Sequence, residues 1–179
     1  MTDNQFWTVI MSQLSAVLSA AGMGAVNLVN SFMPDQQGAP DYPLALFYPV
    51  TSKRYGYQKK TDTFNEDDED FDHTESWILE RTIQVSAWVK QDPADLAQMT
   101  SFDVVNAIAG FLMSEPFRLS LLASGIGIIR ITDIRQTQFK DEHEQYVENP
   151  SFDFTVNYMQ TLEMKVPTIS DITDTIIRV

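Results

Sequence analysis

The stretch that decides the fold is residues 151–166, which read SFDFTVNYMQTLEMKV. Its even-numbered positions are apolar except for Gln160, and its odd-numbered positions are polar except for Met159. This alternation is typical of a β-strand that buries one face, because successive side chains on a strand point to opposite sides. An amphipathic helix would repeat its apolar residues every three or four positions. We therefore predict a strand over the whole stretch.

The length of this strand is as informative as its pattern. At roughly 3.3 Å per residue it spans about 50 Å, whereas a compact domain of this size is about 40 Å across. The strand therefore bends sharply or reaches beyond its own domain. We expect the second outcome, and a protruding strand offers its edge to another chain.

Size and composition narrow the class of protein. The chain has 179 residues, and this length predicts a single domain over 1–179. Within it we expect an acidic hairpin insertion at about 57–76 and a C-terminal tail at about 167–179. Cysteine is absent, which excludes disulfides and thiolate metal sites. No window suits a transmembrane span and residues 1–4 lack the basic region of a secretory signal, so we expect no membrane partner. The net charge of −13 disfavours nucleic-acid binding, since affinity for a duplex comes mainly from cations that meet phosphates.

Apolar spacing predicts two main helices. The first covers residues 4–21, with Asp3 as its N-cap. The second begins at residue 100, is broken or kinked by Pro116, and continues over residues 117–123.

The other patterned stretches predict strands. We expect a short, largely buried strand over residues 42–50, a longer one over 77–90, and another over 126–139 with a bulge or bend near residues 130–133. Residues 27–41 are expected to form turns. The predicted fold is α+β, with a mixed, mostly antiparallel sheet, two main helices on one face and long protruding hairpins.

Residues 61–76 mark the sharpest change in composition. Eight carboxylates lie between Asp62 and Glu75 with little apolar content, so we expect a long charged loop at the tip of a hairpin whose arms are residues 44–59 and 77–90. An electrostatic role is one alternative to a simple solvated loop. A calcium or magnesium site is another, but an EF-hand loop needs a mid-loop glycine that this segment lacks.

The sequence contains no motif for catalysis or cofactor binding. It has no Gly-x-Ser-x-Gly, no cysteine nucleophile and no P-loop or dinucleotide-binding glycine pattern. His73 and His143 are the two histidines, and neither belongs to a zinc-binding cluster. We therefore predict no enzymatic activity, no cofactor and no bound metal.

Several groups of residues are candidates for contacts with other molecules. A basic stretch interleaved with tyrosines could touch phosphates, or pair with the acidic stretch of its own hairpin or of a neighbour. Trp88 stands among the polar residues of its strand, so it either covers its own sheet or meets a partner. The apolar tail is expected to lie on a surface, its own or a neighbour's. The candidate interaction residues are Lys53, Arg54, Lys59, Lys60, Glu66, Asp67, Asp68, Glu69, Asp70, Asp72, Trp88, Ile172, Ile176 and Ile177.

Three runs of sequence resemble a known family. They are IIRITDIR at residues 128–135, FKD at 139–141 and YVENPSFDF at 146–154. Together they resemble the neck- or tail-terminator proteins of tailed bacteriophages, also called gateway or head-to-tail completion proteins, and the order of elements agrees along nearly the whole chain. The resemblance implies one small domain built from a helix, a strand with a long insertion, a second helix and a final hairpin.

The same resemblance implies a function. The protein would be a structural component of the virion neck, assembled in the host cytoplasm as a ring, usually of six copies. The ring would lie between the portal with its adaptor or collar proteins and the first ring of the tail tube or sheath, and genomic DNA would pass through it without sequence-specific binding. The resemblance gives no role to the acidic insertion.

Other functions stay open on sequence alone. A non-catalytic adaptor or assembly chaperone could capture a basic partner with the acidic loop, and an enzyme with a carboxylate-bound metal has almost no support. Strands that overshoot their domain suit a ring closed by heterologous contacts. An acidic wall would let DNA slide by repulsion, so we hypothesise that residues 66–72 face the channel or dock on a basic ring of the tail.

Overall fold

The structure is a computed structural model that describes residues 1–30, 43–67, 70–92, 94–95, 97–140 and 146–167. Helices and strands alternate irregularly along this part of the chain. They are α1 (Asp3–Ala20), β1 (Asn27–Asn30), β2 (Leu44–Asn65), β3 (Asp70–Trp88), α2 (Ser101–Met113), α3 (Glu115–Ala123), β4 (Ile126–Ile131), β5 (Arg135–Lys140) and β6 (Tyr146–Val166).

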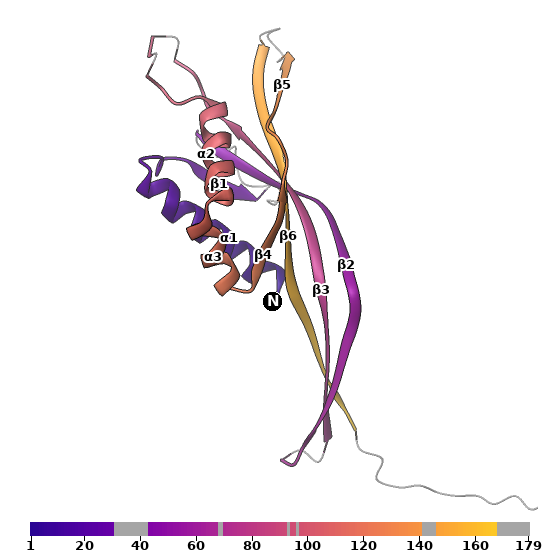
Figure 1. The fold of residues 1–179 in the computed structure, drawn as a ribbon. Helices are drawn as coiled ribbons and strands as arrows, with labels where there is room; N and C mark the ends of the chain where they lie inside the picture. The colour runs from indigo at the N-terminus through magenta and orange to yellow at the C-terminus, as the bar shows by residue number, and fades with distance from the viewer. Residues whose placement is uncertain (31–42, 68–69, 93, 96, 141–145, 168–179) are drawn as a thin grey trace, which may run out of the picture.

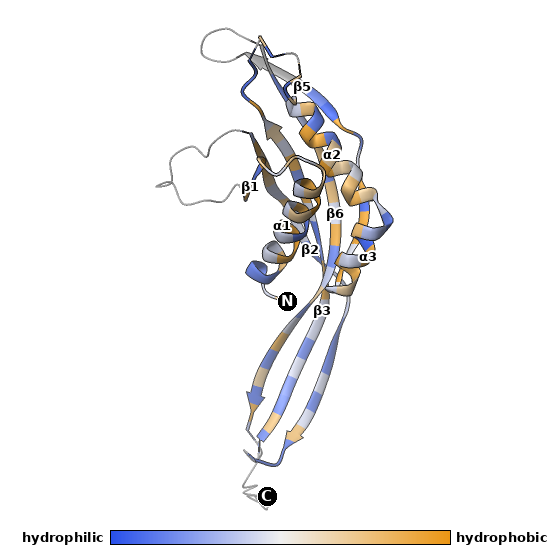
Figure 2. Ribbon diagram, turned by 90° about the vertical axis from the view of Figure 1, so that its left-hand side faces the viewer, coloured by the Kyte–Doolittle hydropathy of each residue, from blue (hydrophilic) through white to orange (hydrophobic). Residues whose placement is uncertain are grey.

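The described strands form one sheet with the order β1-β2-β3-β6-β4, and β5 pairs with the early part of β6. Only β1 and β2 run parallel, and every other pair is antiparallel. The helices cover one face of this sheet (Figures 1 and 2). The predicted α+β fold with a mixed, mostly antiparallel sheet is therefore confirmed.

The core lies between the helices and the middle of the sheet. Strand β6 directs its even-numbered residues toward the helices, as its alternation predicts, and β3 contributes its odd-numbered residues. Burial of these apolar side chains is the main stabilising term. The fully buried large side chains include Phe6, Ile10, Leu14, Leu18, Phe47, Ile83, Ile108, Leu112, Leu121, Ile126, Phe152 and Phe154.

The first helix begins one residue earlier than predicted. Its N-cap is Thr2, whose hydroxyl accepts from the backbone N–H of Gln5 at 3.3 Å while the Gln5 side chain accepts from the Thr2 N–H at 2.8 Å. The prediction of Asp3 as the N-cap was wrong, because this reciprocal pair satisfies two of the helix's free N–H groups at once. Asp3 instead forms an ion pair with Arg81 of β3.

The interruption of the second helix and the irregularity of the strand that follows it both lie where they were predicted. Helix α2 ends at Met113, and α3 starts at once with Pro116 in its first turn, where a missing N–H does no harm. The strand after α3 is divided into β4 and β5, and the β4 register against β6 shifts between Ile128 and Arg130.

Two predictions about residues 27–50 were wrong. Residues 27–30, expected as turn, form strand β1 beside β2. The strand expected over residues 42–50 continues to Asn65, because Pro49 lies at an irregularity of the register, where a missing ladder hydrogen bond is tolerated. The rest of the expected turn, residues 31–41, lies outside the described residues.

The acidic segment is strand rather than loop. Pairing between β2 and β3 continues to the pair of Asn65 with Asp70, so residues 61–65 and 70–76 are strand and residues 66–67 form a turn. Strand β6 also pairs with β3 as far as the pair of Phe71 with Val166. Pairing on both sides of β3 satisfies its backbone and overrides the unfavourable charge of the segment.

Replacing Phe154 by alanine tests the core. We expect the Phe154→Ala variant to lose about 3–5 kcal/mol of unfolding free energy, because a fully buried ring leaves a cavity. Urea unfolding monitored by circular dichroism measures the loss. Met159→Ala on the same strand is the control, since Met159 is 59% exposed and should change stability by less than about 0.5 kcal/mol. Equal losses in both variants would contradict the assignment of the two faces.

Candidate functional site

Three strands run together beyond the helices (Figure 1). We call this part the ribbon, and it consists of residues 59–65 of β2, 70–78 of β3 and 159–166 of β6. The last pair between β4 and β6 joins Ile126 to Tyr158, and the last pair between β1 and β2 joins Asn30 to Phe47. No further strand of the described chain extends the sheet on either side of the ribbon, although the terminal amine of Met1 donates to the carbonyl of Met159 at 3.2 Å.

The two faces of the ribbon differ in chemistry. The register of β3 is continuous, so the face that carries core residues in the domain can be followed to the tip by alternation. On that face five large apolar side chains are 36–48% exposed, namely Phe64, Phe71, Leu162, Met164 and Val166. We call these five residues the tip face. The opposite face of the same rows carries Thr61, Thr63, Asp72, Thr74, Ser76, Thr161, Glu163 and Lys165.

The tip face includes one aromatic contact. The rings of Phe64 and Phe71 meet edge to face with centroids 5.3 Å apart. This geometry is favourable for aromatic pairs. Hydropathy bands alternate along the strands below the helices (Figure 2), so the ribbon is amphipathic although none of the described helices covers it.

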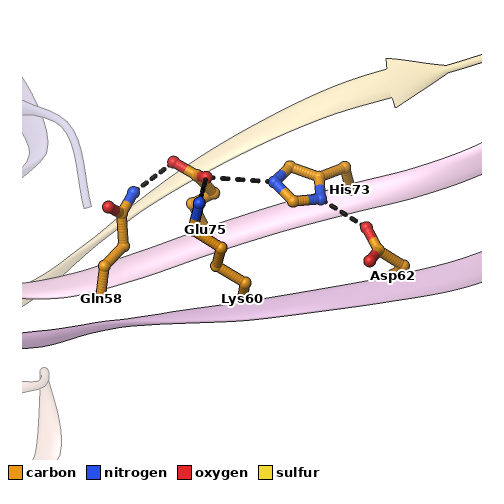
Figure 3. Close-up of polar contacts among 5 residues, drawn as sticks. All are labelled: Gln58, Lys60, Asp62, His73 and Glu75. Atoms are coloured by element: carbon orange, nitrogen blue, oxygen red, sulfur yellow. Dashed lines mark hydrogen bonds and ion pairs between the residues drawn. The ribbon is translucent and has the colours of Figure 1, made fainter.

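A polar cluster lies on the same face of the ribbon as the tip face (Figure 3). It shares two rows with it, because Met164 pairs with His73 and Leu162 pairs with Glu75. Glu75 accepts from Lys60 Nζ at 3.1 Å, from His73 Nε2 at 3.2 Å, and from the Gln58 side chain. His73 Nδ1 contacts Asp62. Lys60 is paired with Glu75 and Asp62 with His73 in the strand register, so these are direct cross-strand contacts of the kind that stabilise sheets.

The cluster favours the charged forms of its members. Hydrogen bonds from His73 to Asp62 and then to Glu75 raise the pKa of the imidazole above its ordinary value of 6.5. Hydrogen bonds from His73 and then Lys60 lower the pKa of Glu75 below its ordinary value of 4.5. Protonated His73 therefore links strands β2 and β3 near the tip.

The two shifts predict that the ribbon is most stable in mildly acidic solution. The raised pKa of His73 stabilises the folded ribbon in full below pH 6.5, the ordinary pKa of histidine. This contribution is lost as the pH rises through the higher pKa of His73 in the folded state. The lowered pKa of Glu75 stabilises the folded ribbon above pH 4.5, the ordinary pKa of glutamate. This contribution is lost as the pH falls through the lower pKa of Glu75 in the folded state. Hydrogen exchange of residues 70–76, corrected for intrinsic rates, measures this stability.

A histidine variant provides the control. His73→Gln should remove the loss of protection at alkaline pH while leaving the exchange of the core strands unchanged. A wild-type ribbon whose corrected protection does not fall between pH 6 and pH 9 would contradict the assigned role of His73.

The predicted basic residues mostly contact their own chain. Lys53 forms an ion pair with Glu80 at 3.0 Å, and the guanidinium of Arg54 lies 4.3 Å from the ring centroid of Trp77. This cation–π contact covers Trp77, which is only 8% exposed at the base of the ribbon. Lys60 belongs to the polar cluster, and Lys59 is exposed on the opposite face of the ribbon.

Among the predicted acidic residues that the structure describes, two lie at the turn and two lie on one face of the ribbon. Glu66 and Asp67 are exposed at the turn, and Asp70 and Asp72 lie on the face opposite the tip face. Asp68 and Glu69 lie outside the described residues, as do His143 and the tail residues Ile172, Ile176 and Ile177.

Trp88 is not part of the ribbon. It is partly buried at the other end of the sheet, packs against Val29, Leu44 and Leu46, and donates from Nε1 to Asn149 Oδ1 at 3.2 Å. These contacts are those of the alternative in which Trp88 covers its own sheet.

The sequence analysis missed a second exposed apolar surface, on α2, α3 and β4. Met113, Leu119, Leu122 and Ile129 are 50–62% exposed, and we call these four residues the shoulder patch. A hollow of about 450 Å³ lies beside them and is also lined by Glu115 and Arg118. Leu119 and Leu122 are one helical turn apart, on the opposite side of α3 from the buried Phe117 and Leu121, so their spacing was the available signal.

Within the described residues, no group of three or more acidic, histidine or cysteine side chains is arranged to hold a metal ion. The described helices include none with the length and apolar content needed to cross a membrane.

The fold and its exposed surfaces are those of a protein that acts through contacts with other chains, since bare apolar faces and open strand edges mark interaction sites. Comparison with known families gives the particular class. Residues 5–168 match the family of the E217 gateway protein gp29, and the chain belongs to that family. The resemblance seen in the sequence is therefore confirmed. No match was found among curated proteins.

Membership of this family establishes the general role of the chain. It is a structural protein of a tailed bacteriophage and belongs to the head–tail junction, in the neck of the virion.

Proposed function

We propose that the chain forms a ring, of six copies, that ends the tail tube or sheath and joins it to the portal through adaptor or collar proteins. The ring assembles in the host cytoplasm, catalyses no reaction, and leaves a central channel for the genome. The family places the protein at the junction, and the ribbon is the observation that carries the rest of the proposal.

The ribbon supports a ring because it presents two different edges. The outer edge of β2 after Phe47 and the outer edge of β6 after Tyr158 are not extended by any described strand. Unpaired N–H and C=O groups along an edge favour addition of a strand from another chain. Two unlike edges on one molecule allow head-to-tail contacts, which close into a ring when the rotation between copies permits.

Ring formation is tested by mass and by electron microscopy. The purified protein, alone or mixed with tail tubes, should give closed rings by negative-stain imaging and a matching multiple of the monomer mass. The alternative, an adaptor or chaperone that captures a basic partner, predicts a monomer that binds that partner without forming a ring. A monomer under both conditions would contradict the proposed ring.

The charge of the ribbon turn supports a role in guiding DNA or docking on the tail. Between Lys59 and Glu75 the sequence carries eight carboxylates against two lysines. A negative wall repels a DNA duplex and prevents it from adhering, and the same charge attracts a basic protein ring. We propose that residues 66–72 either face the channel or contact a basic ring of the tail.

Neutralising the turn tests this role. Replacing Asp67, Asp68, Glu69 and Asp70 by asparagine or glutamine should leave the melting temperature nearly unchanged but reduce particle assembly or DNA ejection. Asp133→Asn combined with Glu148→Gln is the control, because both residues are exposed and outside the ribbon. Phage with the neutralised turn and undiminished infectivity would reject the proposal.

A further inference from the structure

The tip face is an apolar surface without cover in the described chain. Its five side chains come from three strands and form adjoining rows, because Phe64, Phe71 and Val166 are successive partners in the register. Exposed apolar side chains gathered on one face mark a contact with another molecule more often than scattered ones do. The exposed carboxylates of Glu66 and Asp67 at the adjoining turn place negative charge at one end of this surface. The charged residues of the polar cluster on the same face are paired with one another.

The shoulder patch has matching chemistry. The residues that line a second hollow, of about 210 Å³, include Met113, Ile129, Arg118 and Arg130. Neither arginine forms an ion pair with another described residue. One carboxylate, Glu115, lines the neighbouring hollow, so the patch has two cations against one anion.

The position of the shoulder patch suits a strand partner. It lies at β4, the last strand of the sheet on that side, whose outer edge no described strand extends. A ribbon added to that edge would continue the sheet. If its core-side face remained on the side of the helices, its tip face would be directed toward α3, which packs against β4.

We propose that the tip face of one copy packs on the shoulder patch of the next copy in the ring. The occupant is a second copy because one chain carries both surfaces, with apolar character on each and opposite charge around them. The two surfaces share no residue, so every copy can offer its tip face to one neighbour and its shoulder patch to the other. Such a contact is heterologous and continues around a ring. The inference rests on the proposed ring and names the surfaces that join its members.

Cross-linking tests the contact directly, because the chain has no cysteine of its own. Met164→Cys and Leu122→Cys proteins, one with a mass tag, are co-expressed, assembled and treated with a short bis-maleimide. We expect a linked heterodimer. The matched control replaces Met164→Cys with Thr161→Cys, three residues away on the opposite face of the ribbon, and should give little product.

A charge placed in the contact provides a second measurement. Met164→Asp should weaken assembly by about tenfold or more, since a buried charge without a partner opposes association. Thr161→Asp should change assembly by less than about twofold. Circular dichroism and the melting temperature of both variants establish that they are folded.

The outcomes separate the contact from the ring. Normal rings of the Met164→Asp variant, together with no cross-link between Met164→Cys and Leu122→Cys, would overturn the contact and leave the proposed ring standing. Linking of Met164→Cys to a tail protein, with none to Leu122→Cys, would also overturn it. A chain that stays monomeric alone and on tail tubes would overturn both proposals.

Discussion

Antiparallel pairing between β3 and β6 joins the two parts of this molecule. It runs from the pair of Ser86 with Ser151 to the pair of Phe71 with Val166 without a register shift. In the domain this pairing lies under the helices, and beyond them it continues as the centre of the ribbon (Figure 1). Because alternation along a strand is strict, the register that buries Ile83 and Phe154 also decides which side chains form the tip face.

The ribbon and the domain differ in what stabilises them. The domain buries large apolar side chains from α1, α2 and the sheet, whereas the ribbon depends on backbone pairing, on the aromatic contact of Phe64 with Phe71, and on the ion pairs around Glu75. Exposed ion pairs each contribute little, with a typical value of about 0–1 kcal/mol. Elements with few buried contacts open more readily than core strands, so the ribbon is the part of the fold that gains most from a partner.

The local pattern of apolar and polar residues was sufficient to predict the helices and strands that build the core. The alternation in residues 151–166 predicted β6, apolar spacing predicted the helices, and Pro116 predicted the interruption of the second one. The acidic segment was misjudged because its charge argued against structure, while its pairing depends on β6, far away in the chain. Strand β1 was missed because four residues, Asn27–Asn30, are too few to show a period. The tip face could not be predicted, since it requires the register of three strands together.

The acidic turn has a consequence for the protein before it is assembled. An amphipathic ribbon with open edges is the kind of element that stacks indiscriminately on others like itself. Carboxylates outnumber lysines at its end, so two free ribbons repel each other when they approach end to end, over a distance of about 8–10 Å at physiological ionic strength. This repulsion opposes the association of free ribbons at their ends, and concentrated salt would weaken it.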